Sequence, residues 1–292
     1  MFHGSIVAIV TPLKEGRLDE KAFAELIDFH LRSGTHGIVP CGTTGESATL
    51  SHEEHKRVIE LAVKMAGGRI PVIAGTGSNS TEEAITLTRH AKGAGASGAL
   101  LITPYYNKPT QEGLYQHYKA IAKAVDLPLV LYNIPSRTGV NMLPSTVARL
   151  MEFDNIVGMK EGTGSLQQIS DLVQLCGERL IILSGDDFTA LPTMAVGGKG
   201  VISVTANIAP AEMAKMTEAA LRGDYTEARS LHQKLYPLHQ VLFIETNPIP
   251  VKAALALMGK CTDEVRLPLC RMSEENLKKL KLALKEYGLL KR

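Results

Sequence analysis

Short runs of apolar residues recur along the first two-thirds of the chain, with segments of helical period between them. The runs are continuous in apolar character, which is typical of strands that are buried on both faces of a parallel sheet. They occupy residues 6–10, 37–40, 70–74, 98–102, 127–132, 156–160, 180–183 and 200–204. The first six recur at about 30 residues, the length of one strand–helix unit.

Eight such units predict a closed (β/α)8 TIM barrel, an α/β fold, and an open doubly wound sheet is the structural alternative. The segments between the runs, such as 20–31, 53–65 and 81–92, show the period of amphipathic helices and agree with both folds. The count of eight favours the barrel.

The strand signal ends near residue 211, and the rest of the chain has helical periodicity only. The helical segments occupy residues 211–221, 225–241, 250–258 and 274–287. This tail is too long for one barrel helix, so we predict a barrel domain over residues 1–224 and a small C-terminal helical domain over residues 225–292. No Gly/Ser-rich linker separates the two, so we expect them to pack together.

Composition and charge narrow the classes of function. Of the 292 residues, 45% are hydrophobic and 21% are charged, as in globular proteins. The net charge of +2 and the lack of a basic stripe predict no nucleic-acid partner. No apolar run approaches the roughly 20 residues that span a bilayer, so we expect no membrane partner. The chain begins without a signal peptide and its four cysteines lack zinc spacing, so we expect a cytoplasmic protein.

Polar residues follow the apolar runs, and in a barrel these positions meet at the one rim where active sites are built. The polar segments occupy residues 11–12, 41–46, 75–77, 103–107, 132–133, 160–161, 184–187 and 205–207. Hydroxyl groups, glycines and one amine therefore converge at this rim. Such a rim suits a small polar substrate.

Lys160 closes an apolar strand, where a charge is costly unless it is used or suppressed. Desolvation favours the neutral amine, which is a nucleophile toward carbonyl groups. Tyr132 closes the preceding strand and could transfer the protons that carbinolamine chemistry requires. A Schiff-base site is one interpretation of this pair, and a structural lysine paired with its neighbour Glu161 is the other.

Residues 42–46, Gly-Thr-Thr-Gly-Glu, follow the second run. Consecutive N–H groups and two hydroxyls suit a carboxylate, although a plain strand–helix turn with a capping threonine fits equally well. Phosphate is disfavoured because Asp186 and Asp187 lie where barrels often bind one. Arg137, in a turn bounded by proline and glycine, is a candidate rim cation, and a surface arginine is the alternative.

Two further motifs favour structural roles. Residues 93–98 match G-x-G-x-x-G, but they follow a helix and precede a strand, the reverse of the dinucleotide fingerprint. His52 and His55 are three residues apart, whereas zinc-binding helices space them by four, and Ser51 with Glu54 forms a capping box. We therefore expect no cofactor and no metal, although two histidines one turn apart could line a pocket.

Together these residues resemble the pyruvate-dependent class I aldolase superfamily, which is N-acetylneuraminate lyase-like, and within it the dihydrodipicolinate synthase family. The resemblance covers essentially the whole chain. It is carried by residues 4–12, 37–46, 71–77, 103–107, 132–139, 158–161, 183–187, 200–207 and 247–252. It implies a cofactor-free lyase that condenses pyruvate with L-aspartate 4-semialdehyde to 4-hydroxy-tetrahydrodipicolinate, the first committed step of diaminopimelate and lysine biosynthesis.

The resemblance also implies the catalytic roles. Lys160 matches the imine-forming lysine, and Tyr132 matches the proton donor and acceptor. Thr43 and Tyr106 match the partners of its proton relay, with Tyr106 reaching into the site of a neighbouring subunit.

By the same resemblance, Thr44 matches the contact to the pyruvate carboxylate, and Gly185 and Ile202 match backbone contacts to pyruvate. Arg137 matches the residue that holds the carboxylate of the semialdehyde. Arg137 also distinguishes this family from N-acetylneuraminate lyase and other pyruvate-dependent sugar-acid aldolases, which share the lysine, the tyrosine and the cradle. Such an aldolase, and a barrel with a purely scaffolding role, remain alternatives.

Lysine-inhibited members of the family bind L-lysine at a dimer interface. The matching positions in this chain are Ser47, Ala48, His52, His55, Asn79, Glu83 and Tyr105. The resemblance therefore implies that L-lysine is a feedback inhibitor, and that the chain forms a homotetramer built as a dimer of dimers.

Overall fold

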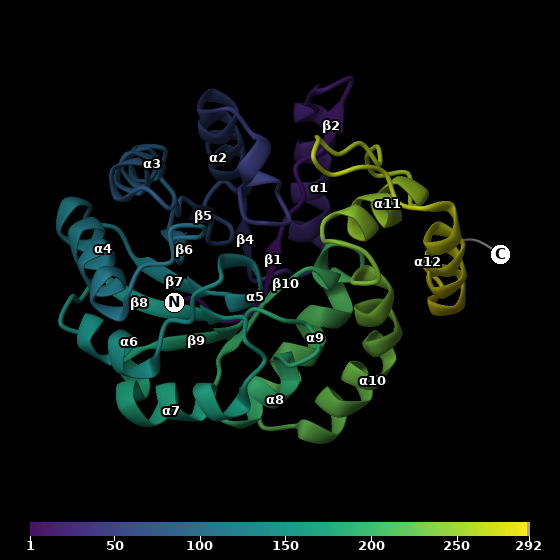
Figure 1. The fold of residues 1–292 in the computed structure, drawn as a ribbon. Helices are drawn as coiled ribbons and strands as arrows, with labels where there is room; N and C mark the ends of the chain where they lie inside the picture. The colour runs from purple at the N-terminus through teal and green to yellow at the C-terminus, as the bar shows by residue number, and fades with distance from the viewer. Residues whose placement is uncertain (291–292) are drawn as a thin grey trace.

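The computed structural model describes residues 1–290 and shows a parallel sheet rolled into a barrel and ringed by helices (Figure 1). Along the sheet the strands follow the order β4 (Gly37–Val39), β1 (Gly4–Ala8), β10 (Gly200–Ser203), β9 (Ile181–Ser184), β8 (Ile156–Glu161), β7 (Leu129–Asn133), β6 (Gly98–Ile102) and β5 (Ile73–Gly75). A parallel bridge between Ile38 and Val72 joins the two ends of this order. The predicted (β/α)8 barrel is therefore confirmed over the open sheet.

Helices cover the outside of the barrel, and each predicted helix is present (Figure 1). They are α1 (Glu20–Arg32), α2 (His52–Ala66), α3 (Thr81–Gly93), α4 (Gln111–Ala124), α6 (Pro144–Leu150), α7 (Leu166–Cys176), α8 (Ala190–Ala195) and α9 (Pro210–Leu221). A single helical turn, α5 (Pro135–Thr138), lies instead in the loop after β7. Among residues 1–290, no helix combines the length and the apolar character that crossing a membrane requires.

One hairpin lies outside the predicted pattern. It consists of β2 (Leu13–Lys14) and β3 (Arg17–Leu18), which pair in antiparallel fashion. Glu15 and Gly16 connect them with φ angles of 52° and 75°, the left-handed backbone that two-residue hairpin turns require. Strands of two residues are too short to show a period in the sequence.

Side chains from alternate strand positions fill the barrel interior. In β1, Ile6 and Ala8 belong to the inner cluster, whereas Val7 packs outward against the helices. The inner cluster also contains Val39, Ile73, Leu100, Val130, Tyr132, Leu183 and Ile202. Both faces of the sheet are therefore buried, which explains the continuous apolar runs.

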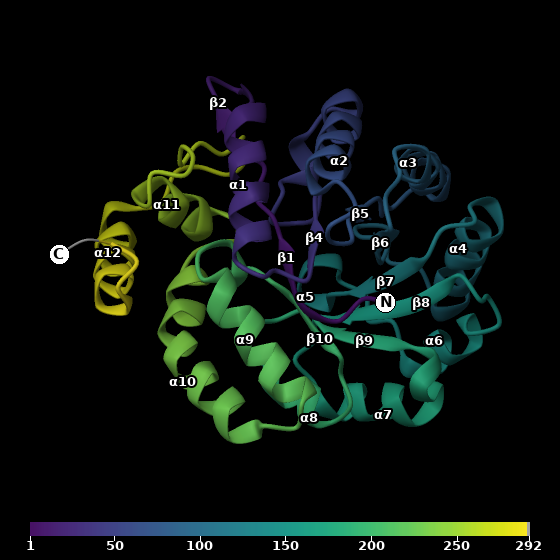
Figure 2. The same cartoon turned by 180° about the vertical axis from the view of Figure 1, so that it is seen from behind.

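The chain after α9 forms α10 (Tyr225–Leu242), α11 (Ile249–Leu257) and α12 (Glu274–Tyr287), which lie along one side of the barrel (Figures 1 and 2). Leu238 of α10 and Leu280 of α12 belong to the same apolar cluster as Phe23 of α1. Barrel and tail thus share one core. The division at residue 225 stays a prediction, and residues 291–292 of the predicted C-terminal domain lie outside the described residues.

This shared core predicts that the last helix stabilises the whole chain. Leu280→Ala removes a fully buried side chain and should lower the free energy of unfolding by about 2–5 kcal/mol. Leu282, two residues further along α12, is 58% exposed, so Leu282→Ala should change that free energy by less than about 0.5 kcal/mol. Urea unfolding of both variants measures the difference. An effect of Leu280→Ala as small as that expected for Leu282→Ala would mean that α12 does not contribute to the core.

Candidate active site

Lys160 and Tyr132 meet at the ends of β8 and β7, where they are register partners. The Nζ atom of Lys160 lies 4.1 Å from the centroid of the Tyr132 ring. The two residues are only 6% and 4% exposed. The amine and the phenol are therefore held together inside the barrel, away from bulk water.

The neighbouring Glu161 points to the other face of β8, because side chains alternate along a strand. Its carboxylate accepts hydrogen bonds from Nδ2 of Asn133 at 3.1 Å and from Nε2 of Gln168 at 2.9 Å. The interpretation of Lys160 as a structural lysine paired with Glu161 is therefore wrong. What remains is an amine that faces an aromatic ring.

The loop after β4 forms a tight turn with two unused donors. The N–H group of Gly45 donates to the carbonyl of Gly42, and that of Glu46 donates to the carbonyl of Thr43, each at 3.1 Å. Within residues 1–290 the N–H groups of Thr43 and Thr44 donate no hydrogen bond. Since two adjacent free N–H groups form an anion-binding concavity, the geometry supports a carboxylate cradle.

Neither threonine of this loop caps a helix, so the capping alternative is wrong. The following helix α2 is capped by Ser51, whose hydroxyl accepts from the N–H group of Glu54 in the predicted capping box. The hydroxyl of Thr44 instead accepts a hydrogen bond of 3.0 Å from Nδ2 of Asn247.

Close packing fixes the position of the cradle. A Cβ atom on Gly75, at the end of β5, would lie 2.1 Å from the carbonyl oxygen of Cys41. Only glycine therefore allows β5 to approach the loop this closely. Cys41 and Glu46, which flank the cradle, adopt φ angles of 55° and 54°, a left-handed backbone that non-glycine residues rarely adopt.

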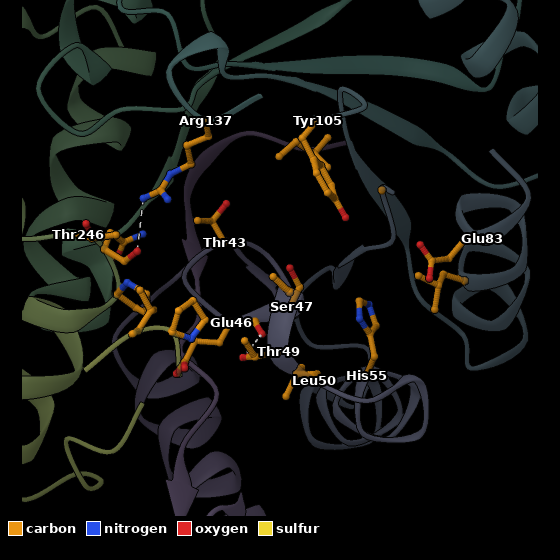
Figure 3. A pocket seen from close by; sticks show the side chains of 18 of the residues that line it. Thr43, Glu46, Ser47, Thr49, Leu50, His55, Glu83, Tyr105, Arg137 and Thr246 are labelled. Atoms are coloured by element: carbon orange, nitrogen blue, oxygen red, sulfur yellow. Dashed lines mark hydrogen bonds between the residues drawn. The ribbon is translucent and has the colours of Figure 1, made fainter. Parts of the chain in front are cut away.

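A cavity of about 430 Å³ opens beside the cradle (Figure 3). Figure 3 shows Arg137 on one side of it and Glu83 on the other, with Thr43 and Ser47 between them. A second cavity of about 40 Å³ is lined by Thr43, Ser47 and Tyr132. Because Thr43 and Ser47 line both cavities, they connect the outer opening with the phenol of Tyr132.

The remaining predicted pyruvate contacts lie on β10 and just after β9, the two strands that follow β8 in the sheet. Ile202 of β10 is in the inner cluster with Tyr132. Gly185 follows β9 and donates its N–H group to the carbonyl of Glu161 at 2.7 Å. A Cβ atom on Gly185 would lie 2.9 Å from Cα of Gly162, so the strand ends approach closely here.

Tyr106 is the one predicted catalytic residue that its own chain does not bring into the site. It is 90% exposed, and its backbone adopts a φ angle of 71°. Tyr105, in contrast, lines the larger cavity.

The predicted effector positions gather in the outer part of that cavity. Its lining includes Ser47, Ala48, His52, His55, Glu83 and Tyr105, but not Asn79. The carbonyl of Asn79 instead accepts a hydrogen bond of 2.9 Å from Nδ2 of Asn107. Nε2 of His52 lies 2.8 Å from a carboxylate oxygen of Glu83, and Ser78 donates its hydroxyl to the other oxygen. The expectation that the two histidines line a pocket is confirmed.

Arg137 and the cradle share a contact that the sequence reasoning missed. Nη2 of Arg137 donates to the backbone carbonyl of Asn247 at 3.3 Å, while the side chain of Asn247 holds Thr44. Asn247 comes from the segment between α10 and α11, far away in the sequence. In the sequence, Asn247 stands before a proline and within residues 247–252 that carry the family resemblance, but neither feature identifies a partner.

Asp187 has a structural role that the sequence analysis did not predict. Its carboxylate is buried and accepts hydrogen bonds from the hydroxyl of Ser203 at 2.5 Å and from the N–H groups of Val204 and Thr205 at 3.0 and 2.9 Å. It therefore fixes the loop after β9 to the end of β10. Among residues 1–290, no group of three or more His, Cys, Asp or Glu side chains is arranged to hold a metal ion.

Comparison with known proteins finds relatives that match almost the whole chain. The model of the dihydrodipicolinate synthetase family matches residues 1–287. The 4-hydroxy-tetrahydrodipicolinate synthase of Thermodesulfovibrio yellowstonii is 62% identical over 291 residues, with 100% of both chains covered.

Two solved structures share the fold. A crystal structure of the chloride-inhibited dihydrodipicolinate synthase from Acinetobacter baumannii, complexed with pyruvate, has a TM-score of 0.98 and 52% identity and covers 99% of this chain and 100% of that one. The enzyme from Cyanidioschyzon merolae with lysine bound has a TM-score of 0.96 and 40% identity, and 99% of each chain is covered.

The burial of His55 predicts a pH effect on stability. Burial lowers the pKa of His55, while its hydrogen bond of 2.7 Å to the carbonyl of Gly75 opposes that effect. The folded chain thus takes up this proton at lower pH than the unfolded chain does. The stability that neutral His55 contributes is present above its unfolded pKa of about 6.5 and is lost as the pH falls below it.

His55→Gln removes this titration and keeps a side-chain donor for the carbonyl of Gly75. Between pH 7 and pH 5 its free energy of unfolding should therefore fall less steeply than that of the wild type. Urea unfolding at a series of pH values measures both slopes. Identical slopes would show that folding leaves the titration of His55 unchanged.

Proposed function

The chain belongs to the dihydrodipicolinate synthetase family, and we propose that it is a lyase that condenses pyruvate with L-aspartate 4-semialdehyde. The product is 4-hydroxy-tetrahydrodipicolinate, in the first committed step of diaminopimelate and lysine biosynthesis. The observation that carries this proposal is the buried Lys160 amine 4.1 Å from the ring centroid of Tyr132, beside a carboxylate cradle. The high identity to named synthases favours this reaction over that of a sugar-acid aldolase.

The reaction begins when Nζ of Lys160 attacks the keto carbon of pyruvate. The carbinolamine loses water to give an imine, and loss of a methyl proton gives the enamine. The enamine carbon attacks the aldehyde carbon of the semialdehyde and forms the new carbon–carbon bond. The amino group of the semialdehyde then displaces the lysine, which closes the six-membered ring and frees the enzyme. No cofactor is required.

Tyr132 moves the protons of these steps, because the centroid of its ring lies 4.1 Å from the amine of Lys160. Thr43 lines both cavities, so it extends the relay from the smaller cavity toward the larger one. Tyr106 completes the relay in a neighbouring subunit, and its 90% exposure in the isolated chain supports this role. The relay therefore requires at least a dimer, and we propose a homotetramer built as a dimer of dimers.

The two carboxylates of the substrates bind at different places. The pyruvate carboxylate lies in the cradle against Thr44, and Gly185 and Ile202 contact pyruvate through their backbones. Arg137 binds the carboxylate of the semialdehyde, because a guanidinium group at the rim of the cavity forms a charge-assisted pair with it.

L-Lysine regulates the enzyme in this proposal. Six of the seven matching positions line the larger cavity, and there Glu83 can meet an ammonium group while the first turn of α2 favours a carboxylate. The lysine-bound enzyme of Cyanidioschyzon merolae supports this assignment. The four unpaired cysteines agree with a cytoplasmic location.

The second substrate provides the test of the proposed reaction. Arg137→Ala should lower turnover of the semialdehyde about 100-fold, because a charge-assisted contact is lost. The pyruvate adduct that borohydride traps on Lys160 should persist in this variant. A coupled assay that follows reductase-dependent NADPH loss measures turnover. Arg149→Ala is the matched control, because Arg149 pairs with Glu112 on the outer surface at 2.8 Å.

An inactive wild type that still traps pyruvate would contradict the proposed second substrate. A wild type that does not trap pyruvate would contradict the Schiff-base chemistry itself.

Regulation gives a separate prediction. Activity should fall as L-lysine rises into the millimolar range, and Glu83→Gln should weaken this inhibition about tenfold because it removes the charge that faces the ammonium group. Glu82→Gln, at the exposed neighbouring position, should behave like the wild type. Wild-type activity that stays constant across this range, together with no heat of lysine binding in calorimetry, would contradict the proposed regulation.

A further inference from the structure

A fully buried ion pair lies beneath the cradle. Nζ of Lys252, on α11, is 2.5 Å from a carboxylate oxygen of Glu46, and the two side chains are 0% and 3% exposed. The same amine donates to the backbone carbonyl of Thr11 at 3.0 Å. The second oxygen of Glu46 accepts from the N–H group of Arg266 at 3.1 Å.

Burial of two charges usually costs as much free energy as their attraction returns, so such a pair is a weak source of stability. Buried ion pairs can instead select one conformation among several. The position of this pair in the chain indicates which conformation it selects.

Glu46 is the residue at which the cradle ends. Its left-handed backbone, with a φ angle of 54°, costs of order 1–3 kcal/mol and persists only where other contacts hold it. Lys252 supplies that restraint through the Glu46 carboxylate. Lys252 also donates to the carbonyl of Thr11. The side chain of Thr11 in turn donates its hydroxyl to the carbonyl of Gly45 at 2.7 Å. Lys252 therefore restrains the cradle from two sides.

We propose that Lys252 is a positioning residue for the cradle: through Glu46 and Thr11 it keeps the free N–H groups of Thr43 and Thr44 aimed at the pyruvate carboxylate. Lys252 lines neither cavity, so it acts through these contacts and not on the substrate. This inference rests on the proposed function. It predicts that the pair controls recognition of the carboxylate and leaves the amine chemistry of Lys160 unchanged.

The test replaces both charges at once. Lys252→Met alone would leave the Glu46 carboxylate buried without its ammonium partner, which is destabilising enough to threaten folding. In the double variant Glu46→Gln/Lys252→Met neither charge of this pair remains, and the volumes are similar. Glu46→Gln alone is the second variant, because it keeps the shape and an acceptor for Lys252. Circular dichroism and the native oligomeric mass establish that each variant is folded.

The readout compares two carbonyl compounds that form an imine on Lys160. Pyruvate has a carboxylate and acetaldehyde has none, and borohydride reduction followed by mass spectrometry counts each adduct. In the double variant the half-saturating concentration of pyruvate should rise about tenfold or more, because misplaced donors lose their alignment. The half-saturating concentration of acetaldehyde should stay within about twofold of the wild type, because acetaldehyde does not use the cradle.

A matched control breaks an ion pair between α1 and α2, on the outside of the barrel. Arg57 donates hydrogen bonds of 2.7 and 2.8 Å to Glu20, and Glu20→Gln/Arg57→Met removes them while leaving Glu46, Lys252 and Arg266 intact. This variant should trap pyruvate as the wild type does. If the Glu46/Lys252 variant traps pyruvate normally, or loses both adducts equally, Lys252 does not position the cradle. A wild type that traps neither compound would contradict the proposed function as well.

Discussion

The register between β7 and β8 is the constraint on which the chemistry of this molecule depends. Tyr132 is paired with Lys160, and the next pair along the strands is Asn133 with Glu161. A slip of one residue would turn the amine outward and place a carboxylate in the barrel. The outward pair resists this slip, because Nδ2 of Asn133 donates to Glu161 at 3.1 Å where both are buried. A polar pair on the outer face thus fixes the reactive pair on the inner face.

The cradle depends on a second set of buried polar contacts, and these come from the end of the chain. Asn247 holds Thr44 and Arg137, while Lys252 and Arg266 hold Glu46. The C-terminal helices are therefore more than a cover for the barrel. These helices and the segments between them supply the hydrogen-bond partners that a strained loop needs, and they reach it because the helices share one apolar core with α1.

Much of the architecture was predictable from the sequence, because strands of a parallel barrel are buried on both faces and are therefore continuous apolar runs. The eight runs, the helices between them and the polar rim all follow from that pattern. The predicted strand limits were less accurate where a residue has no backbone N–H group to donate. The run at residues 70–74 becomes a strand only at Ile73, since Pro71 has no N–H group to give to a neighbouring strand. The short hairpin of β2 and β3 was missed because two residues show no period.

By itself, the sequence determined the fold class, the rim on which polar groups meet and the residue types available there, because the succession of strands and helices along the chain and the side-chain period are local properties. It left open whether Lys160 faces Glu161 or Tyr132, and whether the glycine–threonine loop is a cradle or a plain turn. Only the tertiary structure shows that Lys160 faces Tyr132 and that the loop has two free N–H groups, which support the cradle. The direction of a side chain, and the partner that satisfies a buried donor, depend on strands and loops that are distant in sequence and meet only when the barrel closes.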